Sequence, residues 1–151
     1  MKPDSKNKPS QPLGRILSIT GKDYLRALNL KLGHLDLDRN YYALLLIGSA
    51  EGEITQQELA DLLEIDKVSM LRSIDYLSEK GYVNRVKIDT DRRKYSLELT
   101  AKARKALPEI ERSYVELNKI AFKGIDAAQI DDLLSNLKTI KNNLNEYSSN
   151  L

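Results

Sequence analysis

The chain has 151 residues, of which 41% are hydrophobic and 30% are charged, and its formal net charge is +2. This length and composition fit one folded domain, or one domain with a dimerisation extension. The absence of cysteine and the presence of a single histidine, His34, exclude disulfides, thiolate metal sites, cysteine chemistry and a histidine-rich metal site. No apolar run approaches the roughly 18 residues that span a bilayer, and the polar start lacks the apolar core of a secretory signal. We therefore expect a cytoplasmic protein that uses no metal, cofactor or membrane.

The small net charge hides an uneven distribution along the chain. Residues 36–65 carry seven acidic residues and one basic residue, whereas residues 66–105 carry eleven basic and six acidic residues. A phosphate backbone is attracted to the second block and repelled by the first. Charge blocks are also ordinary on solvated surfaces, so charge alone leaves both interpretations open.

The N-terminal part of the chain predicts a tail followed by two helices. Residues 1–12 combine three prolines with polar residues, which is typical of a flexible tail. Apolar residues recur every three to five positions over residues 13–35 and predict a first helix. Asp38 is a good N-cap for a second, largely buried helix, and Gly52 is placed to end it.

The next two predicted helices follow each other closely. Thr55 and Glu58 have the spacing of a capping box, which predicts that a helix begins there. After a short break, Asp66 is the N-cap of a helix that runs to about Lys80 and is closed by Gly81. Three apolar residues of this helix recur at i, i+4 and i+7 and predict one core-facing stripe: Met70, Ile74 and Leu77.

The apolar period then changes from helical to alternating. Val86 and Ile88 alternate with basic residues, and a second alternating segment covers residues 94–99. The two segments are joined by the charged stretch 89–93 and predict a β-hairpin with a charged tip.

Two more helices are predicted, one starting at Thr100 and one opened by Asp126. Two short helices followed by a basic hairpin are the layout of a winged helix-turn-helix. The predicted fold is therefore mainly α with a small β-hairpin wing (α+β). A DNA-binding domain at residues 36–100 lies between dimerisation helices at residues 13–35 and 101–151.

The helix that follows Asp66 has the features of a DNA-reading helix. Because its apolar stripe faces the core, its first two turns present other residues outward, where they reach base edges in a major groove. These residues are Lys67, Val68, Ser69, Leu71 and Arg72. Arg72 suits bidentate binding to guanine, and Ser69 can donate or accept a hydrogen bond. Val68 or Leu71 suits contact with a thymine methyl.

The hairpin suggests a second contact with DNA. Its tip carries three basic residues in a row: Arg92, Arg93 and Lys94. An arginine at such a tip fits a narrow minor groove, where the negative potential is enhanced. We interpret Asp91 as a support that holds a neighbouring arginine in position. Arg85 and Lys87, on the predicted polar face of the first strand, are interpreted as phosphate contacts.

Other functions need weighing against DNA binding. A winged helix can serve as a protein-interaction module without DNA binding, and a basic hairpin can be only a solvated edge that blocks aggregation. The acidic residues between positions 51 and 64 follow a solvated helix and loop, and no phosphate loop or nucleophile elbow is present. We therefore expect no catalytic residues and no enzymatic activity.

Residues 39–103 resemble the MarR family of bacterial regulators (multiple antibiotic resistance regulators). Residues 66–83, DKVSMLRSIDYLSEKGYV, resemble the family's recognition helix and its exit. Asp91-Arg92-Arg93 followed by Leu97-Glu98-Leu99-Thr100 resembles its wing signature, D-x-R and then L-x-L-T. Two positions depart from the family pattern: Leu71 replaces a small polar residue, and Ala103 replaces a frequent glycine.

The resemblance implies a homodimer that binds a pseudo-palindromic operator on double-stranded DNA, usually as a repressor. Independently of the resemblance, the first, fifth and sixth predicted helices carry more apolar surface than one winged helix covers. A two-fold interface between two copies would bury this surface. It would also place two reading helices about one DNA turn, roughly 34 Å, apart. An intrachain helical layer remains the alternative.

The resemblance also implies release from DNA by a small effector, often aromatic or anionic, bound between the dimerisation helices and the DNA-binding part. His34, Tyr41, Tyr42 and Arg112 are the candidates to line such a pocket. Surface packing is the alternative for each tyrosine. The family further implies a bacterial or archaeal regulator associated with the nucleoid.

Overall fold

The computed structural model describes residues 9–151, apart from the side chain of Arg92, so most of the predicted tail at residues 1–12 lies outside the described residues. In chain order the elements are α1 (Leu13–Leu32), the 3₁₀ helix η1 (Gly33–Leu35), α2 (Tyr41–Ser49), β1 (Ile54–Thr55), α3 (Gln56–Leu63), α4 (Lys67–Glu79), β2 (Val83–Ile88), β3 (Asp91–Leu99), α5 (Ala101–Ala121) and α6 (Ala127–Ser149). The prediction of a mainly helical fold with a small β wing is confirmed. Among the described helices, none is long and apolar enough to cross a membrane.

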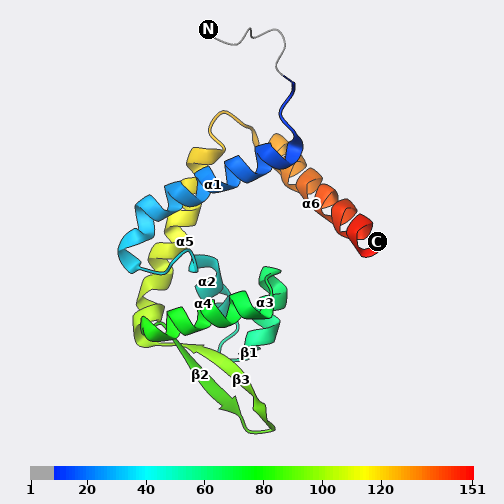
Figure 1. The fold of residues 1–151 in the computed structure, drawn as a ribbon. Coiled ribbons are helices and arrows are strands. Elements are labelled where there is room, and N and C mark those ends of the chain that lie inside the picture. The colour runs from blue at the N-terminus through cyan, green and yellow to red at the C-terminus, as the bar shows by residue number, and fades with distance from the viewer. Residues whose placement is uncertain (1–8) are drawn as a thin grey trace, which may run out of the picture. The chain divides into compact units, whose positions relative to one another are not determined.

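The chain forms two compact units. The first extends to Val115 and holds the elements from α1 to the first part of α5, and the second comprises Glu116–Leu151. In the first unit, β2 and β3 extend from the helices as a two-stranded ribbon, with α4 crossing beside their base (Figure 1).

The helix-turn-helix is built from local capping contacts. The Thr55 hydroxyl accepts a hydrogen bond from the Glu58 backbone N–H at 3.1 Å, and the Glu58 carboxylate accepts one from the Thr55 N–H at 2.8 Å. This confirms the predicted capping box at the start of α3. Glu64 ends α3 in a left-handed conformation with φ of 53°, and Asp66 then caps α4. The tight break between the two helices therefore follows from residues that lie next to each other in the sequence.

The sheet has three antiparallel strands in the order β1-β3-β2. Ile54 of β1 pairs with Leu97, and Val83 of β2 pairs with Leu99. The strand β1 was not predicted, because two residues are too few to display an alternating pattern. The prediction of a tip at residues 89–93 is wrong: β3 already begins at Asp91, which pairs with Ile88 across a register shift.

The core of the first unit lies where α4 faces α2, α3 and the sheet. Met70, Ile74 and Leu77 are each 0–1% exposed, which confirms the predicted stripe. The other fully buried large side chains come from α1, α2, α3, β3, α5 and the turn before α2: Leu28, Leu32, Leu37, Tyr41, Leu44, Ile47, Leu59, Leu97 and Ile110.

The boundaries of the first two helices differ from the prediction. Helix α1 ends at Leu32, and the chain then tightens into η1. Asp38 is not an N-cap, because its φ is 45° and it lies in the turn in which the Asn40 N–H donates to the Leu37 carbonyl. Helix α2 therefore begins only at Tyr41, and it ends at Ser49, before Gly52.

The second unit contains the end of α5 and the helix α6. Asp126 and Gln129 form a capping box, which confirms the predicted start of α6. No residue of α6 is buried, and several of its large apolar side chains are 41–67% exposed: Leu133, Leu134, Leu144 and Tyr147. The N-terminal part of α1, in the first unit, also exposes apolar side chains.

Truncation of the α4 stripe tests the role of this core. We expect Ile74→Ala to lower the free energy of unfolding by about 3 kcal/mol, because it removes three methyl or methylene carbons from a fully buried site and leaves a cavity. The control Val68→Ala lies on the same helix but is 60% exposed, and it should change stability by less than about 0.5 kcal/mol. Urea unfolding followed by circular dichroism measures both, and equal effects of the two substitutions would contradict the packing described above.

Candidate nucleic-acid interface

Helix α4 has one buried face and one exposed face. The five residues predicted to read DNA lie outside the Met70–Leu77 stripe, and all five are exposed: Lys67, Val68, Ser69, Leu71 and Arg72. The two apolar residues among them, Val68 and Leu71, are 60% and 47% exposed. The structure thus brings these five side chains together on one accessible surface, and their binding to DNA stays a prediction.

The start of α4 is fixed by Asp66. One carboxylate oxygen accepts a hydrogen bond from the Ser69 backbone N–H at 2.8 Å, and the other accepts one from the Ser69 hydroxyl at 2.7 Å. These two bonds hold the pKa of the Asp66 carboxyl below its usual value of 3.8. Because the Ser69 hydroxyl already donates to Asp66, it is available to an incoming base mainly as an acceptor.

The wing carries an internal aspartate–arginine contact. The Arg93 backbone N–H donates to the Asp91 carboxylate at 3.0 Å, and Arg93 Nε lies 3.6 Å from the same oxygen. This contact matches the expectation that Asp91 supports a neighbouring arginine. The Arg93 side chain is nevertheless 94% exposed, so the pairing leaves most of its guanidinium accessible. Arg92 belongs to β3, but its side chain lies outside the described residues.

Arg85 is not on the polar face of its strand, so that expectation was wrong. Its guanidinium lies 2.5 Å from a carboxylate oxygen of Asp75 on α4, and its Nε donates to the Gln56 side chain at 3.4 Å. The outward position in β2 belongs instead to Val86, which is 38% exposed. Arg85 therefore joins the wing to α3 and α4, and of the two expected phosphate contacts on β2 only Lys87 is exposed.

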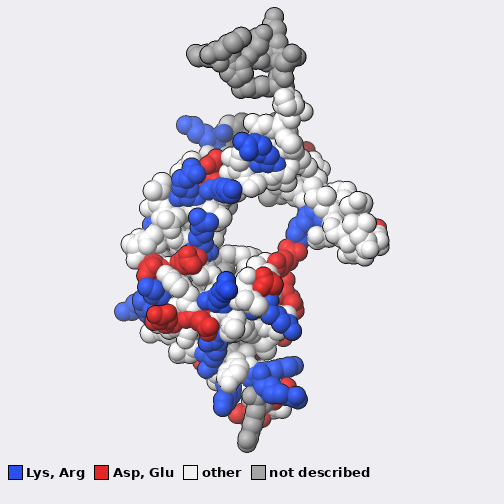
Figure 2. Space-filling model, in the orientation of Figure 1, with Lys and Arg blue, Asp and Glu red and all other residues white. Residues whose placement is uncertain are grey.

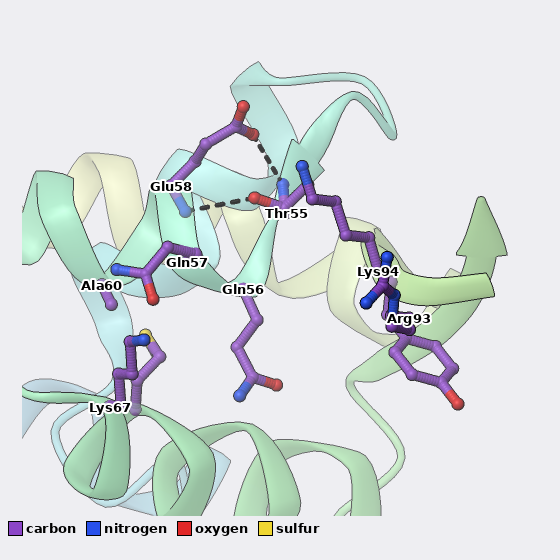
Figure 3. A pocket seen from close by; sticks show the side chains of 10 residues that line it. Thr55, Gln56, Gln57, Glu58, Ala60, Lys67, Arg93 and Lys94 are labelled. Atoms are coloured by element: carbon purple, nitrogen blue, oxygen red, sulfur yellow. Dashed lines mark hydrogen bonds between the residues drawn. The ribbon is translucent and has the colours of Figure 1, made fainter. Parts of the chain in front are cut away.

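A hollow of about 410 Å³ lies between the start of α3, the start of α4 and β3. Three cationic side chains line it, Lys67 from α4 and Arg93 and Lys94 from β3, and Figure 3 shows them on opposite sides of the opening. Figure 2 shows lysine and arginine side chains gathered on the wing, at the lower end of the view. The fold thus brings together cations that lie 26 residues or more apart in the sequence.

Sequence analysis did not assign several lining residues of this hollow to a site, among them Gln56, Gln57 and Tyr95. The capping box at Thr55 contains the signal for the two glutamines, because it fixes them in the first turn of α3. No comparable signal exists for Tyr95, which the sequence shows only as one residue of an alternating strand.

Comparison with known proteins agrees with this geometry. A model of the MarR family matches residues 36–94, which run from the end of η1 through α4 to the start of β3. In this segment the chain is similar to the MarR family. The matched segment contains the reading face of α4 and most of the lining of the hollow.

Solved structures of MarR proteins share the whole fold. A crystal structure of MarR is 25% identical, with 97% of this chain and 100% of that chain covered and a TM-score of 0.77. A MarR transcriptional regulator from Methanosarcina mazei Go1 is 26% identical, with 89% and 97% covered and a TM-score of 0.78. A mutant of MarR from E. coli, complexed with operator DNA, is 27% identical, with 85% and 93% covered and a TM-score of 0.78.

The four residues named for a MarR-type effector pocket do not form one site. His34 Nε2 lies 2.8 Å from a carboxylate oxygen of Glu109 on α5. Both residues line a hollow that is not lined by Tyr41, Tyr42 or Arg112. Tyr41 is 1% exposed and donates from its hydroxyl to Asn29 at 2.9 Å, whereas Tyr42 is 54% exposed. Arg112 is exposed on α5.

Tyr114 of α5 is a further tyrosine of the first unit. Burial first, and then the charges of Tyr24, Tyr41 and Tyr42, raise the pKa of Tyr114 to about 12. The Tyr114 hydroxyl is therefore un-ionised at neutral pH and can act as a hydrogen-bond donor.

Acid titration tests the cap of α4. Because the pKa of Asp66 is lower in the folded than in the unfolded chain, its contribution to stability is present above about pH 4 and is lost as the pH falls through the folded value. Asparagine caps helices as well as aspartate does but does not titrate. We therefore expect the free energy of unfolding of the wild type to fall more than that of Asp66→Asn between about pH 5 and pH 3. Urea unfolding at each pH measures the difference, and parallel curves would contradict it.

Proposed function

We propose that this protein is a homodimeric transcription regulator that binds double-stranded DNA with sequence specificity. The observation that carries the proposal is the pairing of an exposed α4 face with a cation-lined hollow between α4 and the wing. The proposal is also supported by the similarity of residues 36–94 to the MarR family and by the similar E. coli protein complexed with operator DNA.

In the proposed complex, α4 enters a major groove and the wing reaches the neighbouring minor groove. A helix about 10–12 Å wide fits a major groove of similar width, and residues near its N-terminus contact base edges. The sugar-phosphate strand that separates the two grooves then passes between α4 and β3. Lys67, Arg93 and Lys94 line that passage, so their charges neutralise its phosphates.

The homodimer rests on apolar surface that the chain leaves uncovered. Helix α6 buries no residue yet exposes four large apolar side chains, and α1 exposes others: Leu13, Ile16, Leu17 and Ile19. Exposed apolar side chains gathered on each of these helices favour an interface. Two copies related by a two-fold axis bury the same patch on each other and read a pseudo-palindromic site.

We further propose that the protein is a repressor released by a small aromatic or anionic effector. The chemistry for such a ligand lies in Tyr114, whose raised pKa keeps its hydroxyl a hydrogen-bond donor, and in the exposed ring of Tyr42. We propose that the effector is recognised by ring stacking and hydroxyl hydrogen bonds.

Two arginine substitutions test DNA binding and distinguish its two parts. After duplexes are selected from a random library, anisotropy titrations at several salt concentrations give affinity, base preference and salt slope. Arg72→Ala should relax preference at one position by about 1–3 kcal/mol, because it removes a base contact. Arg93→Ala should weaken binding to all sequences and reduce the salt slope by about one, because it removes a phosphate contact.

Arg26→Ala is the matched control, since it removes an exposed arginine from α1. It should leave affinity, preference and slope unchanged. If the wild type binds no duplex at low salt, the DNA proposal fails, and the winged helix is then a module that binds protein.

Light scattering tests the homodimer. We expect a molar mass twice the 17.2 kDa of one chain at micromolar concentration. Leu134→Glu places a charge on the apolar face of α6 and should shift the mass toward that of the monomer, whereas Ser135→Glu places the same charge on the opposite side of the helix and should not. A wild-type mass of one chain would refute the homodimer.

A further inference from the structure

The connector between α1 and α2 is bonded to the C-terminal half of the reading helix. The Tyr76 hydroxyl lies 2.7 Å from a carboxylate oxygen of Asp36 and 3.0 Å from its carbonyl oxygen. Lys80 Nζ lies 2.6 Å from the other carboxylate oxygen. Asp36, Tyr76 and Lys80, here called the connector clasp, join segments that are 40 residues apart in the sequence.

Further contacts surround the connector clasp. The Tyr82 hydroxyl, just before β2, donates to the Leu35 carbonyl at 2.6 Å. The Lys80 ammonium lies over the Tyr76 ring, 5.4 Å from its centroid. Lys102 of α5 donates to the Lys80 carbonyl at 2.8 Å. The connector is thus held by α4, by the start of the wing and, through Lys80, by α5.

The charge of Asp36 is maintained by its partners. Hydrogen bonds from Lys80 and then from Tyr76 hold the pKa of the Asp36 carboxyl below its usual value of 3.8, so it is an anion at neutral pH. The backbone of Asp36 is left-handed, with φ of 53°. Aspartate and asparagine tolerate this conformation better than other residues with a side chain.

Residues 33–40 connect α1 to α2 and are hydrogen-bonded to α4 through Asp36. Only Leu28 and Leu32, at the end of α1, are buried, and the rest of this helix is exposed or half-buried. The apolar side chains exposed near its start, such as Leu13 and Ile16, are the ones proposed to contact a second copy. A shift of α1 relative to α4 therefore acts on residues 33–40, where the connector clasp lies.

The length of α4 makes its tilt matter for DNA. Thirteen residues span about 20 Å, with the reading residues at one end and Tyr76 and Lys80 near the other. A tilt of about 10° at the Lys80 end moves the reading end by about 3.4 Å, which is the rise of one base pair. A small loss of restraint at the connector clasp is therefore enough to change which half-site spacing fits.

We propose that Asp36, through Tyr76 and Lys80, is a positioning residue that fixes the tilt of α4 against α1 and so sets the spacing of half-sites that the dimer accepts. This inference rests on the proposed function, because it needs two reading helices on one operator. Neither Asp36 nor Tyr76 contacts DNA in this proposal. Removing their bonds should therefore alter spacing selectivity without altering base preference.

The test uses the full chain and three operators: the selected site, and the same half-sites separated by one base pair more or fewer. The variant Asp36→Asn/Tyr76→Phe keeps a left-handed-tolerant residue and the ring beneath Lys80, but removes the charge and the hydroxyl. We expect the wild type to discriminate against the altered spacings and the variant to lose about fivefold or more of that discrimination. Base preference within a half-site and the salt slope should not change.

Asp38→Asn is the matched control. Asp38 is exposed, also has a positive φ of 45°, and makes none of the hydrogen bonds that hold Asp36 to α4. This substitution removes the same charge from the same turn and should keep wild-type discrimination.

Thermal unfolding shows whether each variant is folded at the assay temperature. If the double variant is unfolded at that temperature, the single variant Tyr76→Phe is tested instead, and its loss of spacing discrimination is measured in the same way. A folded variant that keeps wild-type discrimination, or that weakens binding equally at all three spacings, overturns this inference and leaves the proposed function intact. A wild type that binds no DNA overturns the proposed function and this inference with it.

Discussion

The structure of the first unit depends on the way α4 divides its surface. Met70, Ile74 and Leu77 remove one side of the helix from water and fix its rotation about its own axis. Because that rotation is fixed, Lys67, Leu71 and Arg72 can only face outward. The hydrophobic effect is itself non-directional, but by burying this stripe it sets which way the polar residues of α4 face.

Six of the basic residues in positions 66–105 fall into two groups that have different contacts. Lys80, Arg85 and Lys102 are engaged with carboxylates, carbonyls or rings of neighbouring elements, and they hold α4, the wing and α5 in place. Lys67, Arg93 and Lys94 line an open hollow instead. The positive charge of residues 66–105 is therefore only partly available to a phosphate backbone. For this reason the net charge of residues 66–105 overestimates how many cations are available to bind phosphate.

The arrangement also explains how a small unit can be both rigid and responsive. The capping contacts and the stripe restrain α4 locally, within a few residues. The connector clasp restrains its far end through polar contacts at an exposed site, and such contacts are individually weak and easily exchanged for water. The proposed reading surface is thus held by local contacts, whereas the far end of α4 is held by contacts that are more easily broken.

The sequence by itself determined the features that depend on near neighbours. The caps at Thr55, Asp66 and Asp126, the apolar stripe of α4 and the alternation of the hairpin all arise from residues within about one or two turns of each other. Their periods and spacings can therefore be read directly from the chain. The MarR resemblance came from the same local motifs, which is why the fold class and the reading face followed from them.

Only the tertiary structure decided the contacts between distant segments. Arg85 looked like a surface residue because its partners Asp75 and Gln56 are 10 and 29 residues away. Asp36 and Tyr76 carry no local signal of their contact, and neither do the residues that meet in the hollow. A periodic pattern states which face of an element is buried, but not which polar group of another element will meet it. These partners are determined only when the elements pack. In this protein packing fixes the positions of the cations, the connector and the wing.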